Sequence, residues 1–312
     1  MVKKLLFPLL KLGLIAMAFF FLYQKFSTGD FIELSWSWTD SSFIALFLFF
    51  SFGLLNLVLD AKAWQEVQGI LQKISLKKAL EHNFKSYGLA FISPMNSGEI
   101  VGRYIIQEET ENRKKALFLT FWTHAPKMFS KIILVLSILP LLFQSQLGKI
   151  SYLALPLISI IILVYLNLDK VLSWIGTKNL KQRKLEDYIV AGQPKLRSKI
   201  KLLVLNGSRF LIYSLQLTFV LWALNLENIS LEILLSIPIY YLLSALIPSY
   251  SGLDFLIKGT FSLYYFEMFS SNQWGFALAT SLVWLLNWAI PSIIGLLSLK
   301  KIEIDRIRRR RA

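Results

Sequence analysis

Long apolar runs separated by short polar segments make up most of the 312-residue chain. A run of about 18 to 20 apolar residues can cross the hydrocarbon core of a bilayer as one helix. Six runs meet this requirement, and each predicts a membrane-spanning helix. They cover approximately residues 5–23, 43–59, 116–143, 150–166, 202–224 and 276–299.

Two further apolar stretches, 84–106 and 231–269, are interrupted by proline and glycine. Helical hydrogen bonds must lapse at such residues, because proline lacks a donor and glycine permits unusual backbone angles. At membrane depth, lapsed backbone is tolerated only inside protein or along a water-filled cavity. These stretches therefore predict two broken re-entrant hairpins. The arms of the second are also long enough for two nearly complete crossings.

Basic residues outside the apolar runs gather on one predicted side of the membrane. Because cytoplasmic loops carry the excess of Lys and Arg, this bias places both termini in the cytoplasm, with 300–312 as a basic cytoplasmic tail. Six crossings satisfy the bias only if each interrupted stretch returns to its starting side. The basic segments are the N-terminus, 61–85, 103–115, 169–201 and 300–312, whereas the opposite side holds only Lys25 and Lys149.

The two interrupted stretches share one pattern: a proline, a glycine four residues later, then an acid and a base four residues after the acid. In the predicted topology they enter from opposite sides, so units 43–143 and 202–299 form an inverted repeat. Such paired breaks point to a transport site near the midplane. The fold class is an all-α polytopic membrane protein of about six to eight spans, with 1–312 as one integral membrane domain. The shared residues are Pro94, Gly98, Glu99 and Arg103, then Pro248, Gly252, Asp254 and Lys258.

Ionisable side chains at membrane depth are costly, so they mark cavities and functional sites. Spacings of three and four place His124, Lys127 and Lys131 on one face of a helix. In the alternative interpretation these residues have no role in binding. Glu99 and Arg103 then form a structural ion pair within a tight turn, and Lys127 and Lys131 extend to the cytoplasmic headgroups. Gln216 and Asn287 are expected to bond across helices. The predicted substrate-binding residues are Asn96, Glu99, Arg103, His124, Lys127, Lys131, Arg209, Asp254 and Lys258.

Composition supports a membrane protein. The chain is 55% hydrophobic and 17% charged, with a mean hydropathy of +0.55, which leaves too little polar surface for a soluble domain. The net charge of +15 matches cytoplasmic loops that meet anionic lipid, so no nucleic-acid partner is predicted. The absence of cysteine excludes disulfides and thiolate metal sites. The two histidines lack metal-motif spacing, so no metal, cofactor or catalytic residue is predicted.

Several short motifs carry a resemblance to a known family. They are Trp64, Ile74-Ser75-Leu76, Ala79, Gly88, Pro94 and Gly98-Glu99 before Arg103, then Pro248-Ser249, Gly252 and Trp288-Ala-Ile-Pro291. In these motifs the chain resembles the transmembrane region of lysylphosphatidylglycerol synthases, a family that also contains stand-alone bacterial membrane proteins. The resemblance implies a flippase in the bacterial inner membrane. It would move a phospholipid or a polyprenyl-phosphate-linked lipid between leaflets.

Three functions are therefore weighed. The leading hypothesis is a lipid translocase that is not an enzyme, with anionic lipid headgroups as its partners. The second is a scaffold or partner subunit of a separate lipid-synthesising or cell-envelope enzyme. The third is an intramembrane lipid-modifying enzyme that uses His124 with Glu99. A homo-oligomer is compatible with each.

Overall fold

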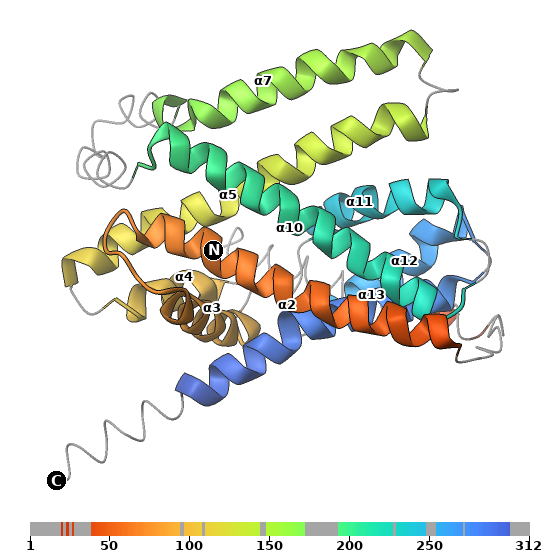
Figure 1. Ribbon diagram of the computed structural model, residues 1–312, viewed down its shortest axis with the longest axis horizontal. Coiled ribbons are helices and arrows are strands. Elements are labelled where there is room, and N and C mark those ends of the chain that lie inside the picture. The colour runs from red at the N-terminus through yellow and green to blue at the C-terminus, as the bar shows by residue number, and fades with distance from the viewer. Residues whose placement is uncertain are drawn as a thin grey trace.

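The described part of the chain is helical (Figure 1). The computed structural model describes residues 39–93, 97–107, 110–143, 148–171, 193–226, 229–247, 254–270 and 272–299, together with four isolated positions between 20 and 27. The predicted span 5–23, apart from residues 20 and 23, and the basic tail 300–312 lie outside the described residues. So do Pro94, Asn96, Pro248 and Gly252.

Five of the six predicted spans are confirmed as helices long and apolar enough to cross a membrane. The protein is therefore a multi-pass membrane protein by the length and composition of its helices. Several of the helices extend beyond the predicted runs, because helical hydrogen bonding does not end where hydropathy falls. Thus α2 (Asp40–Gln68) continues past residue 59, α5 (Thr110–Leu142) begins before residue 116 and α10 (Leu196–Ala223) begins before residue 202. The five are α2 (Asp40–Gln68), Phe118–Leu142 of α5 (Thr110–Leu142), Gly148–Leu166 (η1, Gly148–Leu153, with α7, Ala154–Leu166), α10 (Leu196–Ala223) and Gln273–Leu299.

The last of these spans is not a uniform α-helix. It begins as α13 (Gln273–Trp284), widens into a π-helical turn labelled η4 (Leu285–Ala289), and continues as α-helix over 290–299. A π-helical turn inserts one residue into a helix and is frequent at functional sites. Here the turn contains Asn287, one of the polar residues singled out in the sequence.

Helices α2 and α10 lie antiparallel at the centre of the molecule (Figure 1). Near the start of α2, the Gln216 amide donates to the Phe49 carbonyl at 3.3 Å. Near its end, Ser198 Oγ donates to Glu66 Oε1 at 2.7 Å. Helix α5 packs against α10, and α7 packs outside α5 with few buried residues. The polar faces of α2, α5 and α10 therefore meet inside the protein.

Two pairs of shorter helices flank this centre. They are α3 (Leu76–Phe91) with α4 (Ser97–Ile105), and α11 (Leu231–Leu246) with α12 (Asp254–Glu267). Within the first pair the Gly98 N–H donates to Ser93 Oγ at 2.6 Å, which ties the start of α4 to the end of α3. None of the four has the length required of a candidate span. Their re-entrant placement and their relation as an inverted repeat remain predictions.

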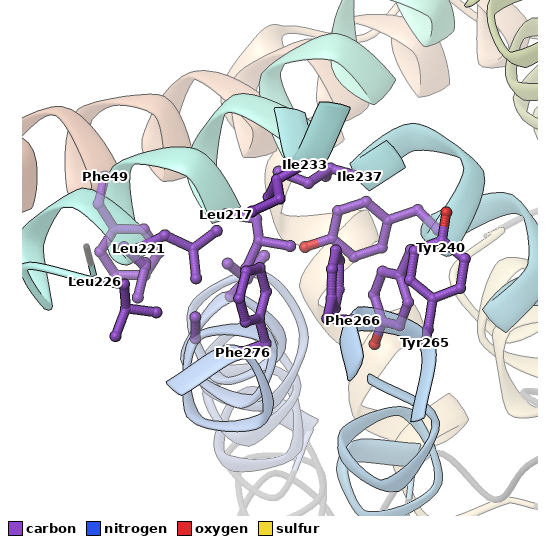
Figure 2. Close-up of a cluster of buried hydrophobic side chains, with 14 of the residues drawn as sticks. Phe49, Leu217, Leu221, Leu226, Ile233, Ile237, Tyr240, Tyr265, Phe266 and Phe276 are labelled. Carbon is purple, nitrogen blue, oxygen red and sulfur yellow. The ribbon is translucent and has the colours of Figure 1, made fainter. Parts of the chain in front are cut away.

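A large aromatic and aliphatic cluster fixes the second pair against α10 and α13 (Figure 2). The rings of Phe266 and Phe276 stack at 4.2 Å between centroids. Two tyrosines also satisfy backbone carbonyls at helix contacts: Tyr265 Oη donates to Ser236 and Tyr240 Oη donates to Lys258, each at 2.9 Å. The Tyr240 bond holds α12 in register with α11, and so sets the position of Lys258.

Candidate functional site

A cavity of about 300 Å³ lies between the two helix pairs. It is lined from α4 on one side and from α11 and α12 on the other, with α5, α10, α2 and the last span completing its wall. Seven of the nine residues predicted to bind substrate line it: Glu99, His124, Lys127, Lys131, Arg209, Asp254 and Lys258.

The other two predicted residues do not line the cavity in the described structure. Arg103 is 1% exposed and lies behind Glu99, and Asn96 lies outside the described residues. The structure thus gathers residues from positions 99 to 258 around one space. Their role in binding substrate remains a prediction.

Glu99 and Arg103 form the predicted pair across one turn of α4. Arg103 Nη2 lies 3.4 Å from Glu99 Oε1, and the guanidinium stacks 3.8 Å from the ring centroid of Trp64. Glu99 Oε2 lies 3.5 Å from His124 Nε2 on α5. A stacked guanidinium holds a fixed orientation. Arg103 therefore positions the Glu99 carboxylate, which faces the cavity.

His82 supports this stack from α3, outside the five candidate spans. Trp64 Nε1 donates to His82 Nδ1 at 3.3 Å. Burial, assisted by the positive charge of Arg103, lowers the pKa of His82 to about 4. The ring is therefore neutral at pH 7, and its Nδ1 accepts a hydrogen bond. Sequence reasoning assigned no role to His82, whose partner is distant in sequence.

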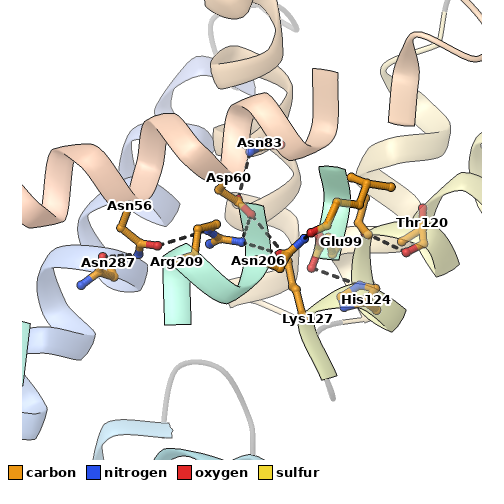
Figure 3. A network of polar contacts seen from close by, with 12 residues as sticks. Asn56, Asp60, Asn83, Glu99, Thr120, His124, Lys127, Asn206, Arg209 and Asn287 are labelled. Atoms are coloured by element: carbon orange, nitrogen blue, oxygen red, sulfur yellow. Dashed lines mark hydrogen bonds and ion pairs between the residues drawn. The ribbon is translucent and has the colours of Figure 1, made fainter. Parts of the chain in front are cut away.

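Asp60 is the main residue that the sequence reasoning missed. This α2 carboxylate is 3% exposed and pairs with Arg209 and with Lys127, whose Nζ lies 3.4 Å from Oδ1 (Figure 3). Asn83 Nδ2 donates to its other oxygen at 3.0 Å. Residue 60 falls between the predicted span, which ends at residue 59, and the predicted basic segment 61–85, so neither prediction includes it. Asn56 was the feature that could have indicated a buried polar residue at position 60, because it lies one helical turn earlier on the same helix face.

A row of amides holds Arg209 in place (Figure 3). Arg209 Nε donates to Asn56 Oδ1 at 3.1 Å, and Asn56 Nδ2 donates to Asn287 Oδ1 at 2.6 Å. Asn287 Nδ2 donates in turn to Gln216 Oε1 at 3.0 Å. The expected bonding of Gln216 and Asn287 across helices is confirmed. The row joins α2, α10 and the π-helical turn of the last span.

The second helix pair also contains an acid and a base four residues apart. Asp254 and Lys258 form an ion pair across one turn of α12, and both line the cavity. Lys131 differs from these residues. Its ammonium lies 5.8 Å from the ring centroid of Phe210, and it forms no ion pair with a described residue. Cations gathered around one cavity are suited to holding an anion, and above all a phosphate.

The described residues contain no group of three or more His, Asp or Glu side chains that could hold a metal ion. Comparison with known proteins adds no family to this geometry. No protein-family model matches the chain, and no curated protein matches it at a significant level. The resemblance to the transmembrane region of lysylphosphatidylglycerol synthases therefore remains a prediction.

Proposed function

We propose that this protein is a lipid translocase, which moves a phospholipid or a polyprenyl-phosphate-linked lipid between the leaflets of a bacterial inner membrane. The supporting observation is the cavity itself. It lies among helices with the length and hydropathy of membrane spans, and seven acidic or basic side chains line it. The polar headgroup occupies the cavity, while the acyl chains remain in the surrounding lipid. In the proposed topology both termini are cytoplasmic.

Before a headgroup binds, the ion pairs of the cavity neutralise its cations. Asp60 neutralises Arg209 and Lys127, and Asp254 neutralises Lys258, so these cations are not left alone at membrane depth. A headgroup phosphate accepts charge-assisted hydrogen bonds from the same cations. The carboxylates keep their ion pairs, and the phosphate joins the same cations as a further anionic partner. These hydrogen bonds offset the cost of desolvating the headgroup.

Movement between leaflets requires the cavity to open to each side in turn. The two helix pairs, α3 with α4 and α11 with α12, contribute matching acid and base pairs. In an inverted repeat, rocking of one unit against the other exposes a central site alternately. We assign this motion to the two pairs, moving around the central α2 and α10.

Lys131→Gln and Lys258→Gln test the proposal in proteoliposomes that contain a fluorescent anionic phospholipid. We expect each variant to slow translocation at least about tenfold, because a hydrogen bond to a charged group contributes that much to binding. Accessibility of the fluorophore to an impermeant quencher measures the rate. The matched control is Lys77→Gln, which removes the same charge from an exposed position outside the cavity.

The thermal midpoint of each variant is measured beside its rate, so that misfolding is recognised. Folded Lys131→Gln and Lys258→Gln variants that translocate lipid at the wild-type rate would contradict the proposal. That outcome would favour the scaffold hypothesis, in which the cavity carries no cargo.

A further inference from the structure

The charges around the cavity do not balance. Among the described residues that line it or pair with its lining, five are lysines or arginines and three are acids, an excess of two basic side chains. His124 is left out of this count because an imidazole with the ordinary pKa of about 6.5 is mostly uncharged at pH 7.5. The cations are Arg103, Lys127, Lys131, Arg209 and Lys258, and the acids are Asp60, Glu99 and Asp254.

The contacts show where the excess lies. Glu99 balances Arg103, and Asp254 balances Lys258. Asp60 is shared between Arg209 and Lys127, which leaves one positive charge over. Lys131 is the other, since it has no ion pair among the described residues.

The excess is concentrated on one face of α5. Lys127 and Lys131 lie four residues apart and both line the cavity. The two segments that join the arms of the helix pairs, 94–96 and 248–253, contain no acidic residue in the sequence. Two positive charges without partners in a site of low dielectric constant are costly. A ligand with two negative charges removes that cost, whereas a ligand with one removes only part of it.

We propose that the cargo is a lipid whose headgroup carries two negative charges, a phosphomonoester or a diphosphate, and that Lys131 recognises the second charge. This inference rests on the proposed function and narrows its substrate class. A phosphodiester headgroup carries a single phosphate charge. A phosphomonoester carries two above its second pKa of about 6. The preference is therefore set by charge number rather than by the chemistry of any substituent.

Equilibrium binding to the full chain in phosphatidylcholine nanodiscs at pH 7.5 tests this inference. We expect phosphatidate, a phosphomonoester lipid, to bind about tenfold or more tightly than phosphatidylglycerol, a phosphodiester. Lys131→Gln should remove the preference by weakening phosphatidate binding far more than phosphatidylglycerol binding. Lys131→Arg, which keeps the charge, and Lys77→Gln, which lies outside the cavity, should retain it.

Equal affinity of the wild-type protein for the two lipids would overturn the inference, as would equal weakening of both by Lys131→Gln. Glycerol 3-phosphate serves as a soluble competitor. Weak competition supports a lipid cargo, whereas binding as tight as that of phosphatidate would show that the ligand is a soluble phosphate ester. Translocation is measured separately. Selective binding without translocation would remove the proposed function and leave the charge preference standing.

Discussion

Replacing Asp60 with asparagine lowers the free energy of unfolding by about 3–5 kcal/mol, the usual cost of leaving buried charges without their partner. The change leaves Arg209 and Lys127 facing each other without an acid between them. The Arg209 side chain is only 16% exposed, so water does not replace the lost carboxylate. Denaturant unfolding of the purified protein in detergent micelles measures the loss.

Two further variants show that the effect comes from the ion pair. Combining Asp60→Asn with Arg209→Gln should cost less than the sum of the single changes, because the double variant buries fewer charges without partners. Asp40→Asn, at the exposed start of α2, should cost less than about 1 kcal/mol. Stability of Asp60→Asn equal to that of Asp40→Asn would contradict the assignment of Asp60 as the central counter-charge.

Gly295→Val lowers the free energy of unfolding by about 3 kcal/mol or more, at the upper end of the usual cost of overpacking. A Cβ at Gly295 would lie 1.7 Å from the carbonyl oxygen of Phe84 on α3. Gly88, on α3, lies in the same helix contact. A Cβ added to it would lie 2.6 Å from the backbone nitrogen of Leu296. Backbone therefore packs directly on backbone where α3 crosses the last span. A larger residue must push the two helices apart.

The matched control for this contact is a glycine in another packed helix. A Cβ at Gly207 in α10 would meet Ser130 at 3.9 Å, an ordinary van der Waals distance. Gly207→Ala should be neutral or stabilising by up to about 1 kcal/mol, because alanine favours the helix. The account of the crossing is wrong if Gly295→Ala unfolds in the same denaturant concentration as Gly207→Ala.

Hydropathy and helical spacing predicted the parts of this protein that depend on local sequence. Five apolar runs became candidate spans because their length and composition alone decide whether they can cross a bilayer. The Glu99 and Arg103 pair formed because residues four apart share a helix face. The same rule placed His124, Lys127 and Lys131 together on the cavity wall.

Contacts between distant helices could not be predicted from one sequence. Asn56 and Asn287 are 231 residues apart, and nothing in either segment indicates its partner. Asp60 was missed because hydropathy marks the end of an apolar run and not the end of a helix. A buried acid at such a boundary is recognised only when its cations, Arg209 and Lys127, are seen beside it.

The most direct test of the translocase is whether its cavity can be reached from both sides of the membrane. The chain contains no cysteine, so a single introduced thiol can be labelled without a background. Ala245→Cys places a thiol on the cavity wall, and Leu155→Cys places one on α7, where the leucine is 71% exposed on a helix expected to face lipid. The reagent is an impermeant maleimide, applied to right-side-out and to inverted vesicles.

We predict that Ala245→Cys is labelled from either side, that phosphatidate slows its labelling, and that Leu155→Cys is labelled from neither. Labelling of Ala245→Cys from one side alone, with and without lipid, would contradict the central claim. The cavity would then be a binding site open to a single compartment.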